Sequence, residues 1–253
     1  MKEQMKISII IPTKNEEKVL PSLLMCLNNQ TLKPYEIIVA DAFSEDNTRK
    51  IAQKHGCKVV EGGLPGKGRN NGAKTAKGDY LFFFDADVKI DNHFLEKASK
   101  EILKRGYQVG TCFNIPYYLK KDKGYNSAFV RLQDKCIYFF HNYGLILGNL
   151  FHFPMATGTF IFCNRNLFRK SKGFDESIAI FEDSEMVGRL SRKGKYGVLR
   201  SVSVLVSTRR FDKKGRFLFP LYMGTRSLLR PMLGEVRNSD YFSEQEEESK
   251  NKK

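Results

Sequence analysis

The sequence lacks the cysteine spacing that a disulfide framework or a zinc site requires. Its five cysteines are scattered along the chain and form no Cys-x-x-Cys pair, so neither a stapled secreted domain nor a zinc-binding domain is indicated. A cleavable signal peptide is also missing, because the N-terminus is polar and passes directly into a predicted strand. These absences predict a protein of the reducing cytoplasm.

Two nucleotide-binding fingerprints are absent as well. The segment Gly68–Gly72 has neither the spacing of a Walker A loop nor that of a dinucleotide fingerprint, which argues against an ATPase and a dehydrogenase. We expect its glycines to give a flexible backbone, from which the Arg69 guanidinium could grip phosphate oxygens.

Acidic residues are scarce toward the C-terminus of a chain whose net charge is +15. Between Arg189 and Arg237, only Asp212 and Glu235 oppose a series of Lys and Arg residues. Such a surface attracts nucleic acid, anionic lipid or phosphorylated ligands, although a solvated basic face without a partner explains the same charge.

Charged residues are missing altogether from residues 136–164, a stretch long enough to suggest a membrane span. The stretch also contains histidine, asparagine, glycine and proline residues, which would leave polar groups unsatisfied in lipid. We therefore predict a buried segment or an apolar wall beside the substrate.

Strand-like and helix-like runs alternate in the first half of the chain, which predicts an α/β fold with a Rossmann-like, mostly parallel twisted sheet. We expect the second half of the same domain to follow, and then a basic helical extension. The predicted strands are 6–11, 35–40, 57–60, 79–84, 107–115, 157–163 and 197–206. The predicted helices are 16–29, 46–55, a short one between the glycine-rich 62–72 and Gly78, 125–143 and 183–193. The predicted divisions are 1–208 for the domain, 209–237 for the basic amphipathic extension and 238–253 for a disordered tail.

Polar residues follow each predicted strand, and ligands bind beyond the carboxyl ends of strands in open α/β sheets. Asp85-Ala86-Asp87 gives the sharpest signal. Alternate residues of an extended segment point the same way, and two carboxylates there suit Mg²⁺ or Mn²⁺ together with substrate phosphates; a turn or a helix cap before Asp91 is the plainer alternative. Asp41 could bind a base or ribose, or could cap the next helix.

Glu182 and Asp183 open a predicted helix, in which Glu185 and Arg189 form an i,i+4 pair. The helix dipole alone favours carboxylates at this position. The functional alternative is a general base, because adjacent like charges and partial burial raise the pKa of a carboxyl group toward a useful value.

These motifs, in this order, resemble the inverting family-2 glycosyltransferases, whose fold is the GT-A type of nucleotide-diphospho-sugar transferase. The resemblance covers roughly residues 6–206. Its matching segments are Pro12–Glu17, Asp41–Thr48, Gly68–Ala73, Gly78–Asp79, Asp85–Asp87, Gly173–Glu176 and Glu182–Asp183.

The resemblance implies a nucleotide-sugar-binding half over 1–106 and an acceptor half over 107–208. A hydroxyl or lipid phosphate of a glycan, lipid-linked or polyprenyl-phosphate acceptor would attack the anomeric carbon of a nucleotide-diphospho-sugar, opposite the leaving diphosphate. The implied site residues are Asp183 with Glu182 for catalysis, Pro12, Thr13, Asn15, Glu16, Asp41, Ser44, Arg69, Asp85 and Ala86 for the donor, and Asp87 with Asp85 for Mn²⁺ or Mg²⁺.

Two departures from the family pattern matter. The family often has Asp-Asp-Gly-Ser where this chain has Asp41-Ala42-Phe43-Ser44, which leaves base recognition open. The chain has no tryptophan and so lacks the Gln-x-x-Arg-Trp motif of processive members, which favours transfer of a single sugar.

Two other functions explain less of the sequence. A sugar nucleotidyltransferase needs a basic, glycine-rich loop after the first strand, where this chain has the acidic Pro12–Glu17. A non-catalytic nucleic-acid-binding protein would explain the charge but not carboxylates at strand ends.

The basic and apolar segment 209–230 is typical of an interfacial helix, although core packing explains the same aromatic residues. We expect Pro220 and Pro231 to break this helix. Its pattern predicts peripheral attachment to an anionic membrane surface, at the inner face of the cell membrane. The sugar, the base and the acceptor are not indicated by the sequence.

Overall fold

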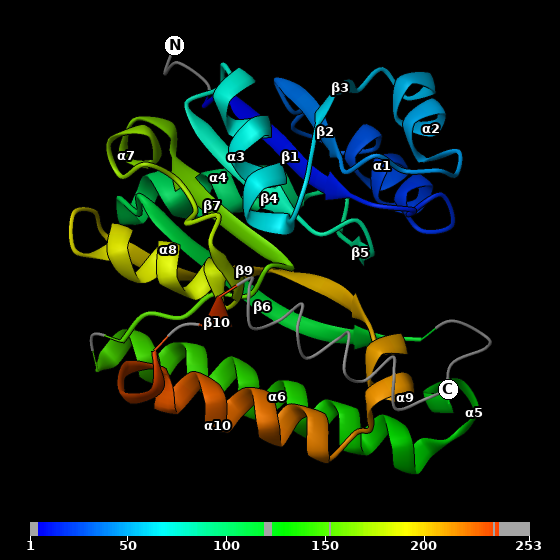
Figure 1. The fold of residues 1–253 in the computed structure, drawn as a ribbon, viewed down its shortest axis with the longest axis vertical. Coiled ribbons are helices and arrows are strands. Elements are labelled where there is room, and N and C mark those ends of the chain that lie inside the picture. The colour runs from blue at the N-terminus through cyan, green and yellow to red at the C-terminus, as the bar shows by residue number, and fades with distance from the viewer. Residues whose placement is uncertain (1–4, 119–122, 152, 235, 238–253) are drawn as a thin grey trace.

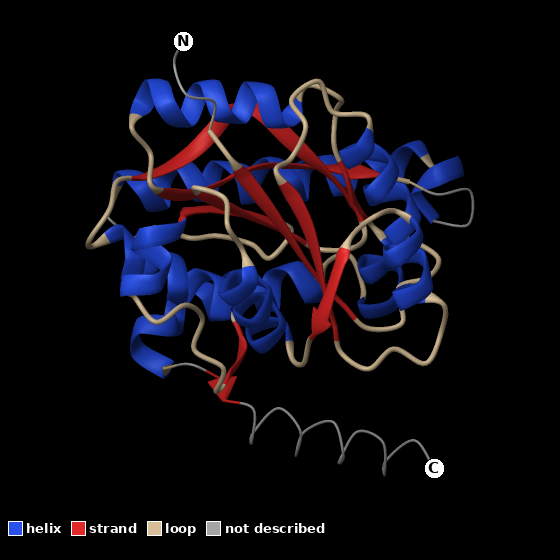
Figure 2. Cartoon of the chain, turned by 90° about the horizontal axis from the view of Figure 1, so that it is seen from above, coloured by secondary structure: helices blue, strands red, loops and turns tan. Residues whose placement is uncertain are grey.

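A twisted sheet forms the centre of the molecule, with helices on both faces (Figures 1 and 2). The computed structural model describes residues 5–118, 123–151, 153–234 and 236–237. Within these residues the main sheet has eight strands in the order β3-β2-β1-β4-β7-β6-β9-β5, and β8 pairs with β10 in a small second sheet. The strands are β1 Ile7–Thr13, β2 Glu36–Asp41, β3 Lys58–Glu61, β4 Tyr80–Phe84, β5 Val88–Lys89, β6 Val109–Tyr117, β7 Phe160–Asn164, β8 Ile178–Ile180, β9 Tyr196–Ser207 and β10 Val236–Arg237.

The half of the sheet that carries the predicted donor motifs is parallel. β1 pairs in parallel with β2 and β4, and β2 pairs in parallel with β3. β7 then runs antiparallel to both β4 and β6, whereas β6 and β9 are parallel. The carboxyl ends of β2, β1 and β4 therefore share one edge, as the alternating sequence pattern predicts.

The core has two parts, one on each face of the sheet, because alternate residues of a strand point to opposite faces. Ile9 and Phe82 pack on one face with α1, α2 and α4, while Ile10 and Phe83 pack on the other with α3, α7 and α8. These helices are α1 Leu20–Asn28, α2 Thr48–Lys54, α3 Pro65–Thr75, α4 Phe94–Arg105, α7 Arg165–Lys170 and α8 Glu182–Ser191.

Helix α3 corrects the expectation of a flexible loop at Gly68–Gly72, because these residues are helical. Glycine lowers helix propensity, but here it lets the helix approach the sheet. A Cβ at Gly68 would lie 3.3 Å from the Pro12 side chain, and one at Gly72 would lie 2.5 Å from Cγ2 of Ile10. Tertiary packing has therefore overridden the local preference.

Helix α1 begins at Leu20, four residues later than the apolar stripe predicts. The preceding backbone is held by the loop after β2: the Glu16 amide donates to Thr48 Oγ1 at 2.8 Å, and the Glu17 amide donates to Asp46 Oδ2 at 3.1 Å. These bonds hold residues 16–19 in a turn rather than in the helix.

Much of the uncharged stretch 136–164 is neither buried nor strand. Its first part lies in the long helix α6, Ala128–Leu150, which follows α5, Lys123–Asn126. Leu145 packs inward, but Phe139, Phe140 and Tyr143 are exposed. The described helices include none with the length and apolar character needed to span a bilayer.

Helices α9, Arg209–Lys214, and α10, Leu218–Leu233, make up the segment after β9. α10 continues through both Pro220 and Pro231, which the sequence suggested as helix breakers; Pro220 lies in the first turn, where the missing N–H is tolerated. Arg216 donates to Asp134 Oδ1 of α6 at 3.1 Å, and Figure 1 shows α10 running along α6. The predicted tail at 238–253 lies outside the described residues.

Candidate active site

The loops after β1 and β2 are joined by a compact hydrogen-bond network. Asp41 is buried, and its Oδ1 accepts from Thr13 Oγ1 at 3.2 Å and from Ser44 Oγ at 2.6 Å. The Asn15 amide donates to Ser44 Oγ at 2.8 Å. Asp41 therefore fixes both loops, while Asp46 bonds Thr48 at the start of α2. The structure thus brings Pro12, Thr13, Asn15, Asp41 and Ser44 together, as the sequence predicts.

Two residues of these loops have left-handed backbones, with φ of 54° at Asn15 and 54° at Phe43. Asparagine tolerates this conformation, whereas phenylalanine is strained in it. The Phe43 side chain is 66% exposed. A strained, exposed aromatic residue between Asp41 and Ser44 is a surface on which a planar base could stack.

Arg69 lies at the centre of a buried charge cluster, with its side chain 2% exposed. One terminal nitrogen donates to Glu182 Oε1 at 2.7 Å and the other to Asp85 Oδ1 at 2.9 Å. Burial disfavours the charged guanidinium, but the neighbouring carboxylates outweigh it and raise the pKa of Arg69. A Cβ at Gly158 would lie 2.6 Å from the second nitrogen, so this backbone must come close to the cluster.

Asp183 is buried beside this cluster. Burial, and next the negative charge of Glu182, raise the pKa of its carboxyl group to about 7, although the positive charge of Arg69 partly opposes them. Its Oδ1 accepts from the Ser184 amide at 2.7 Å. Phe181 precedes the pair with φ of 68° and ψ of 21°, a left-handed turn that a bulky residue adopts only under tertiary constraint. A carboxyl group of this pKa is suited to proton transfer near neutral pH.

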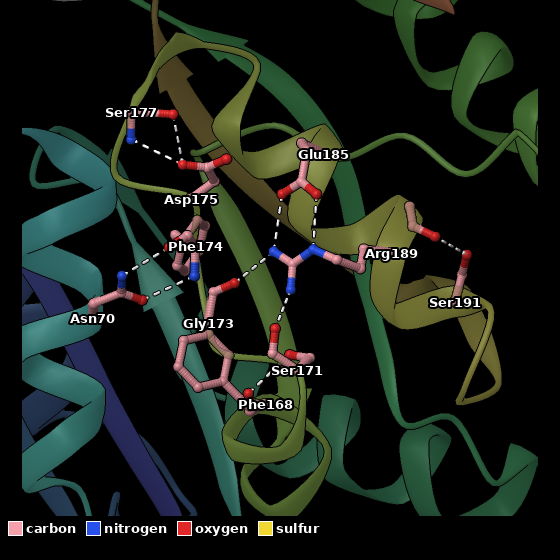
Figure 3. Close-up of polar contacts among 11 residues, drawn as sticks. Asn70, Phe168, Ser171, Gly173, Phe174, Asp175, Ser177, Glu185, Arg189 and Ser191 are labelled. Carbon is pink, nitrogen blue, oxygen red and sulfur yellow. Dashed lines mark hydrogen bonds and ion pairs between the residues drawn. The ribbon is translucent and has the colours of Figure 1, made fainter. Parts of the chain in front are cut away.

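The loop before α8 is clamped from two sides (Figure 3). Asn70 of α3 accepts from the Phe174 amide at 2.9 Å and donates to the Phe174 carbonyl at 2.9 Å. Arg189 donates to the carbonyls of Ser171 and Gly173 and forms the predicted i,i+4 pair with Glu185, at 2.7 Å. These contacts hold the loop 171–174 between α3 and α8, while Arg69 of α3 binds Glu182 at the start of α8.

Asp85 and Asp87 flank Ala86 in a turn after β4 rather than in an extended segment. Asp85 faces Arg69, whereas Asp87 Oδ2 lies 3.0 Å from a guanidinium nitrogen of Arg209. The two predicted metal ligands therefore bind different cationic groups in this structure.

The residues around Asp87 nevertheless fit a divalent cation. Among the described residues, no three His, Cys, Asp or Glu side chains gather into a ready-made metal site. Mg²⁺ usually takes only one or two carboxylates together with substrate phosphates. Asp87 and Glu16 already converge on one cationic nitrogen of Arg209, at 3.0 Å and 3.5 Å.

Sequence reasoning missed Arg209, because it lies far along the chain in a segment assigned to the surface. It also missed Gly158, whose backbone carbonyl faces Arg69 at 3.5 Å. Asn70 falls inside the matching segment Gly68–Ala73, so that segment contained a signal for it.

Comparisons with known proteins identify the family of the chain. The family model described as glycosyl transferase family 2 matches residues 8–171. The 4,4'-diaponeurosporenoate glycosyltransferase of Staphylococcus haemolyticus is 37% identical over 123 residues, which are 45% of this chain and 32% of that protein. The poly(ribitol-phosphate) beta-glucosyltransferase of Bacillus spizizenii is 38% identical over 102 residues, 36% of this chain and 16% of that protein. The matches thus cover less than a third of these relatives.

Solved structures share the fold. A crystal structure of Staphylococcus aureus TarS has a TM-score of 0.62 at 20% identity, over 92% of this chain and 76% of that one. The mannosyltransferase PcManGT of Pyrobaculum calidifontis, solved with GDP-Man and Mn²⁺, has a TM-score of 0.64 at 18% identity, over 81% of this chain and 57% of that one.

Proposed function

The chain belongs to glycosyl transferase family 2, and from that premise we propose that it is an inverting glycosyltransferase that moves one sugar from a nucleotide-diphospho-sugar to an acceptor. In this proposal residues 1–106 bind the donor and residues 107–208 present the acceptor. The observation that carries it is the meeting of a polar loop network and a buried Arg69–Asp183 charge cluster at one sheet edge.

Asp183 is the proposed general base. Its raised pKa lets it accept a proton near neutral pH, so it can deprotonate an acceptor hydroxyl as that oxygen attacks the anomeric carbon. Glu182 supports this role because its negative charge helps to raise the pKa of Asp183. It also binds Arg69 at 2.7 Å. Attack from the face opposite the leaving diphosphate inverts the configuration of the sugar.

The loops after β1 and β2 are the proposed binding site for the nucleoside. Pro12, Thr13, Asn15, Asp41 and Ser44 would surround the base and ribose, and a surface pocket beside them is lined by Asn15, Glu17, Lys18, Glu45 and Asp46.

Arg69 acts chiefly by holding Asp85 and Glu182, since both of its terminal nitrogens are engaged. A contact between Arg69 and the nucleotide, expected from the family resemblance, would require one of these ion pairs to open.

Asp87 is the proposed ligand of Mn²⁺ or Mg²⁺, with Asp85 and the neighbouring Ala86 turn close to the sugar and ribose. A cation bound there would neutralise the negative charge that grows on the leaving diphosphate. The fit of Asp87 and Glu16 to a cation supports this assignment.

Thermal unfolding in the presence of candidate donors tests the donor and the metal together. A donor at 100 times its dissociation constant stabilises the folded protein by about 2.7 kcal/mol, which corresponds to about 5 °C or more in a chain of this size. We expect one of the UDP-, GDP- or dTDP-sugars to give this shift with Mn²⁺ and a smaller one with EDTA. If none of them changes the unfolding temperature, the donor assignment is wrong.

Two variants separate the metal from the donor. Asp87→Asn should lose the Mn²⁺-dependent part of the shift and abolish turnover. Glu61→Gln, which removes an exposed carboxylate at the end of β3, should behave like the wild type. Full activity of Asp87→Asn in the presence of EDTA would exclude the metal role of Asp87 and leave the donor assignment standing.

Attachment to an anionic membrane surface is the second part of the proposal, with a lipid-linked, polyprenyl-phosphate or other membrane-proximal glycan acceptor. The relatives include a GalNAc(5)-diNAcBac-PP-undecaprenol beta-1,3-glucosyltransferase of Campylobacter jejuni, 32% identical over 94 residues. Exposed apolar side chains are concentrated on α6 and α10, among them Phe140 at 70% and Leu218 at 72%. Together with basic residues of the 209–230 segment other than Arg209 and Arg216, which bind carboxylates, these side chains would make an interfacial surface, each basic residue being worth about 1 kcal/mol near anionic lipid.

Co-sedimentation with liposomes tests this surface. The protein should pellet with anionic vesicles at low salt, less at high salt, and least with neutral vesicles. Phe140→Ser should reduce pelleting, whereas Leu103→Ser, which changes an apolar side chain of α4 that is 61% exposed, should not. Equal and negligible pelleting with both lipids would leave the basic segment to another partner.

A further inference from the structure

Arg209 is the first residue of α9, yet it reaches into the proposed donor site. Its Nη2 lies 3.0 Å from Asp87 Oδ2 and 3.5 Å from Glu16 Oε2. Asp87 follows β4 and Glu16 follows β1, so three distant parts of the chain meet at this nitrogen.

The backbone holds Arg209 in this place. Val206 near the end of β9 pairs with Val88 of β5, which directly follows Asp87. Ser207 and Thr208, which lead from β9 to Arg209, are both buried. The sheet therefore fixes the distance between the two backbones, and the contact is unlike an ion pair between two mobile surface side chains.

The two carboxylates and the guanidinium carry the charges expected of a site in which a metal cation can take the place of the guanidinium. The carboxylates of Asp87 and Glu16 lie 3.0 Å and 3.5 Å from the same guanidinium nitrogen of Arg209. The guanidinium thus balances two carboxylates that would otherwise repel each other. A divalent cation at Asp87 would balance them in its place.

We infer that Arg209 is a donor-site residue: it occupies the cation position at Asp87 before metal and donor bind, and it binds the donor diphosphate once Asp87 holds a divalent cation. The inference rests on the proposed function. A guanidinium suits this exchange, because its N–H groups bind carboxylate and phosphate oxygens with the same geometry. In its second position, Arg209 would stabilise the charge of the leaving diphosphate.

Calorimetric titration with separate probes tests both halves of the inference. The variant is Arg209→Gln, and Arg200→Gln is the control, because it removes the same charge from an exposed position of β9. The probes are Mn²⁺ alone, then UDP or GDP with Mn²⁺, and then uridine or guanosine, which carry the same bases without phosphate.

Arg209→Gln should bind Mn²⁺ alone about 3- to 5-fold more tightly, the effect of removing a competing, partly exposed ion pair. Its affinity for the nucleoside diphosphate should fall by about 10-fold or more, the effect of losing a charge-assisted hydrogen bond. Its affinity for the nucleoside should not change. Arg209→Lys keeps the positive charge but lacks the planar N–H groups of the guanidinium, so its affinities should lie between those of the wild type and of Arg209→Gln. Arg200→Gln should match the wild type.

Wild-type affinity of Arg209→Gln for the diphosphate would overturn the inference and leave the proposed function standing. An equal loss for diphosphate and nucleoside would also overturn it, because that pattern indicates a general distortion of the site. A wild-type protein that binds neither Mn²⁺ nor any nucleotide would instead overturn the proposed function, and this inference with it.

Discussion

Replacing Asp183 by asparagine should make the protein more stable at pH 8 and much less active. Burial raises the pKa of this carboxyl group from 3.8 to about 7. The folded protein therefore holds the proton more tightly than the unfolded chain, and stability falls as the pH rises through this window. Asparagine carries no charge, keeps an oxygen for the Ser184 amide, and so avoids the loss.

The size of the effect follows from the same shift. Each pH unit between the two pKa values corresponds to about 1.4 kcal/mol, so the full shift corresponds to about 4 kcal/mol. The observed gain should be smaller, about 1–3 kcal/mol, because Glu182 and Arg69 share the titration with Asp183. At pH 5 the unfolded chain is already ionised while the folded carboxyl is still protonated, so the advantage of asparagine should be about a third of its value at pH 8.

Chemical denaturation at pH 5 and pH 8 measures this difference directly. Asp175→Asn is the matched control, because hydrogen bonds from Ser177 lower the pKa of that exposed carboxyl group. It should lose about the same stability at pH 5 and at pH 8, because both lie above the unfolded pKa of 3.8. A stability difference for Asp183→Asn that is the same at both pH values would refute the reasoning.

Activity should change in the opposite direction to stability. Loss of a general base reduces turnover by about 10²-fold or more, while nucleotide affinity should stay constant because Asp183 serves the acceptor. In the wild type, turnover should fall below about pH 7 as Asp183 takes up its proton. Weaker nucleotide binding with normal turnover would assign Asp183 to the donor instead.

Three further substitutions, one of them a control, test the packing around the cluster. Arg69→Met should lower the free energy of unfolding by about 3–5 kcal/mol, because it leaves Asp85 and Glu182 without their partner; denaturation at two pH values should show a smaller loss at pH 5, and an equal loss would contradict this. Gly72→Ala places a Cβ 2.5 Å from an isoleucine methyl of β1 and should cost about 1–3 kcal/mol. In the same helix, Gly66→Ala meets its nearest atom at 3.6 Å and should gain up to about 1 kcal/mol; equal shifts in unfolding temperature would contradict the steric argument.

The parallel strands of the first half were predictable because each is an apolar run that ends in polar residues. β1, β2 and β4 lie within two residues of their expected bounds. Their ends could therefore be assigned to one edge before the structure was known, and Thr13, Asp41 and Ser44 do meet there.

Helix α3 could not be predicted from local preference, because three of its residues are glycines that favour loops. Only the close approach to β1 explains them. A helix was predicted over 125–143, where α6 lies, but the absence of charge from 136–164 suggested burial, and exposure depends on which neighbours the fold supplies. The place of Arg209 depends on the pairing of β5 with β9, a register that no local pattern encodes.

Arg69 and Asn70 belong to the first half of the chain, yet they bind Glu182 and Phe174 of the second half. The two halves are therefore not interchangeable modules. A chimera that exchanges residues 107–208 for those of a relative, to change the acceptor, must bring a carboxylate for Arg69 and a backbone turn that meets Asn70. Relatives whose second half meets both demands are the ones to recombine first.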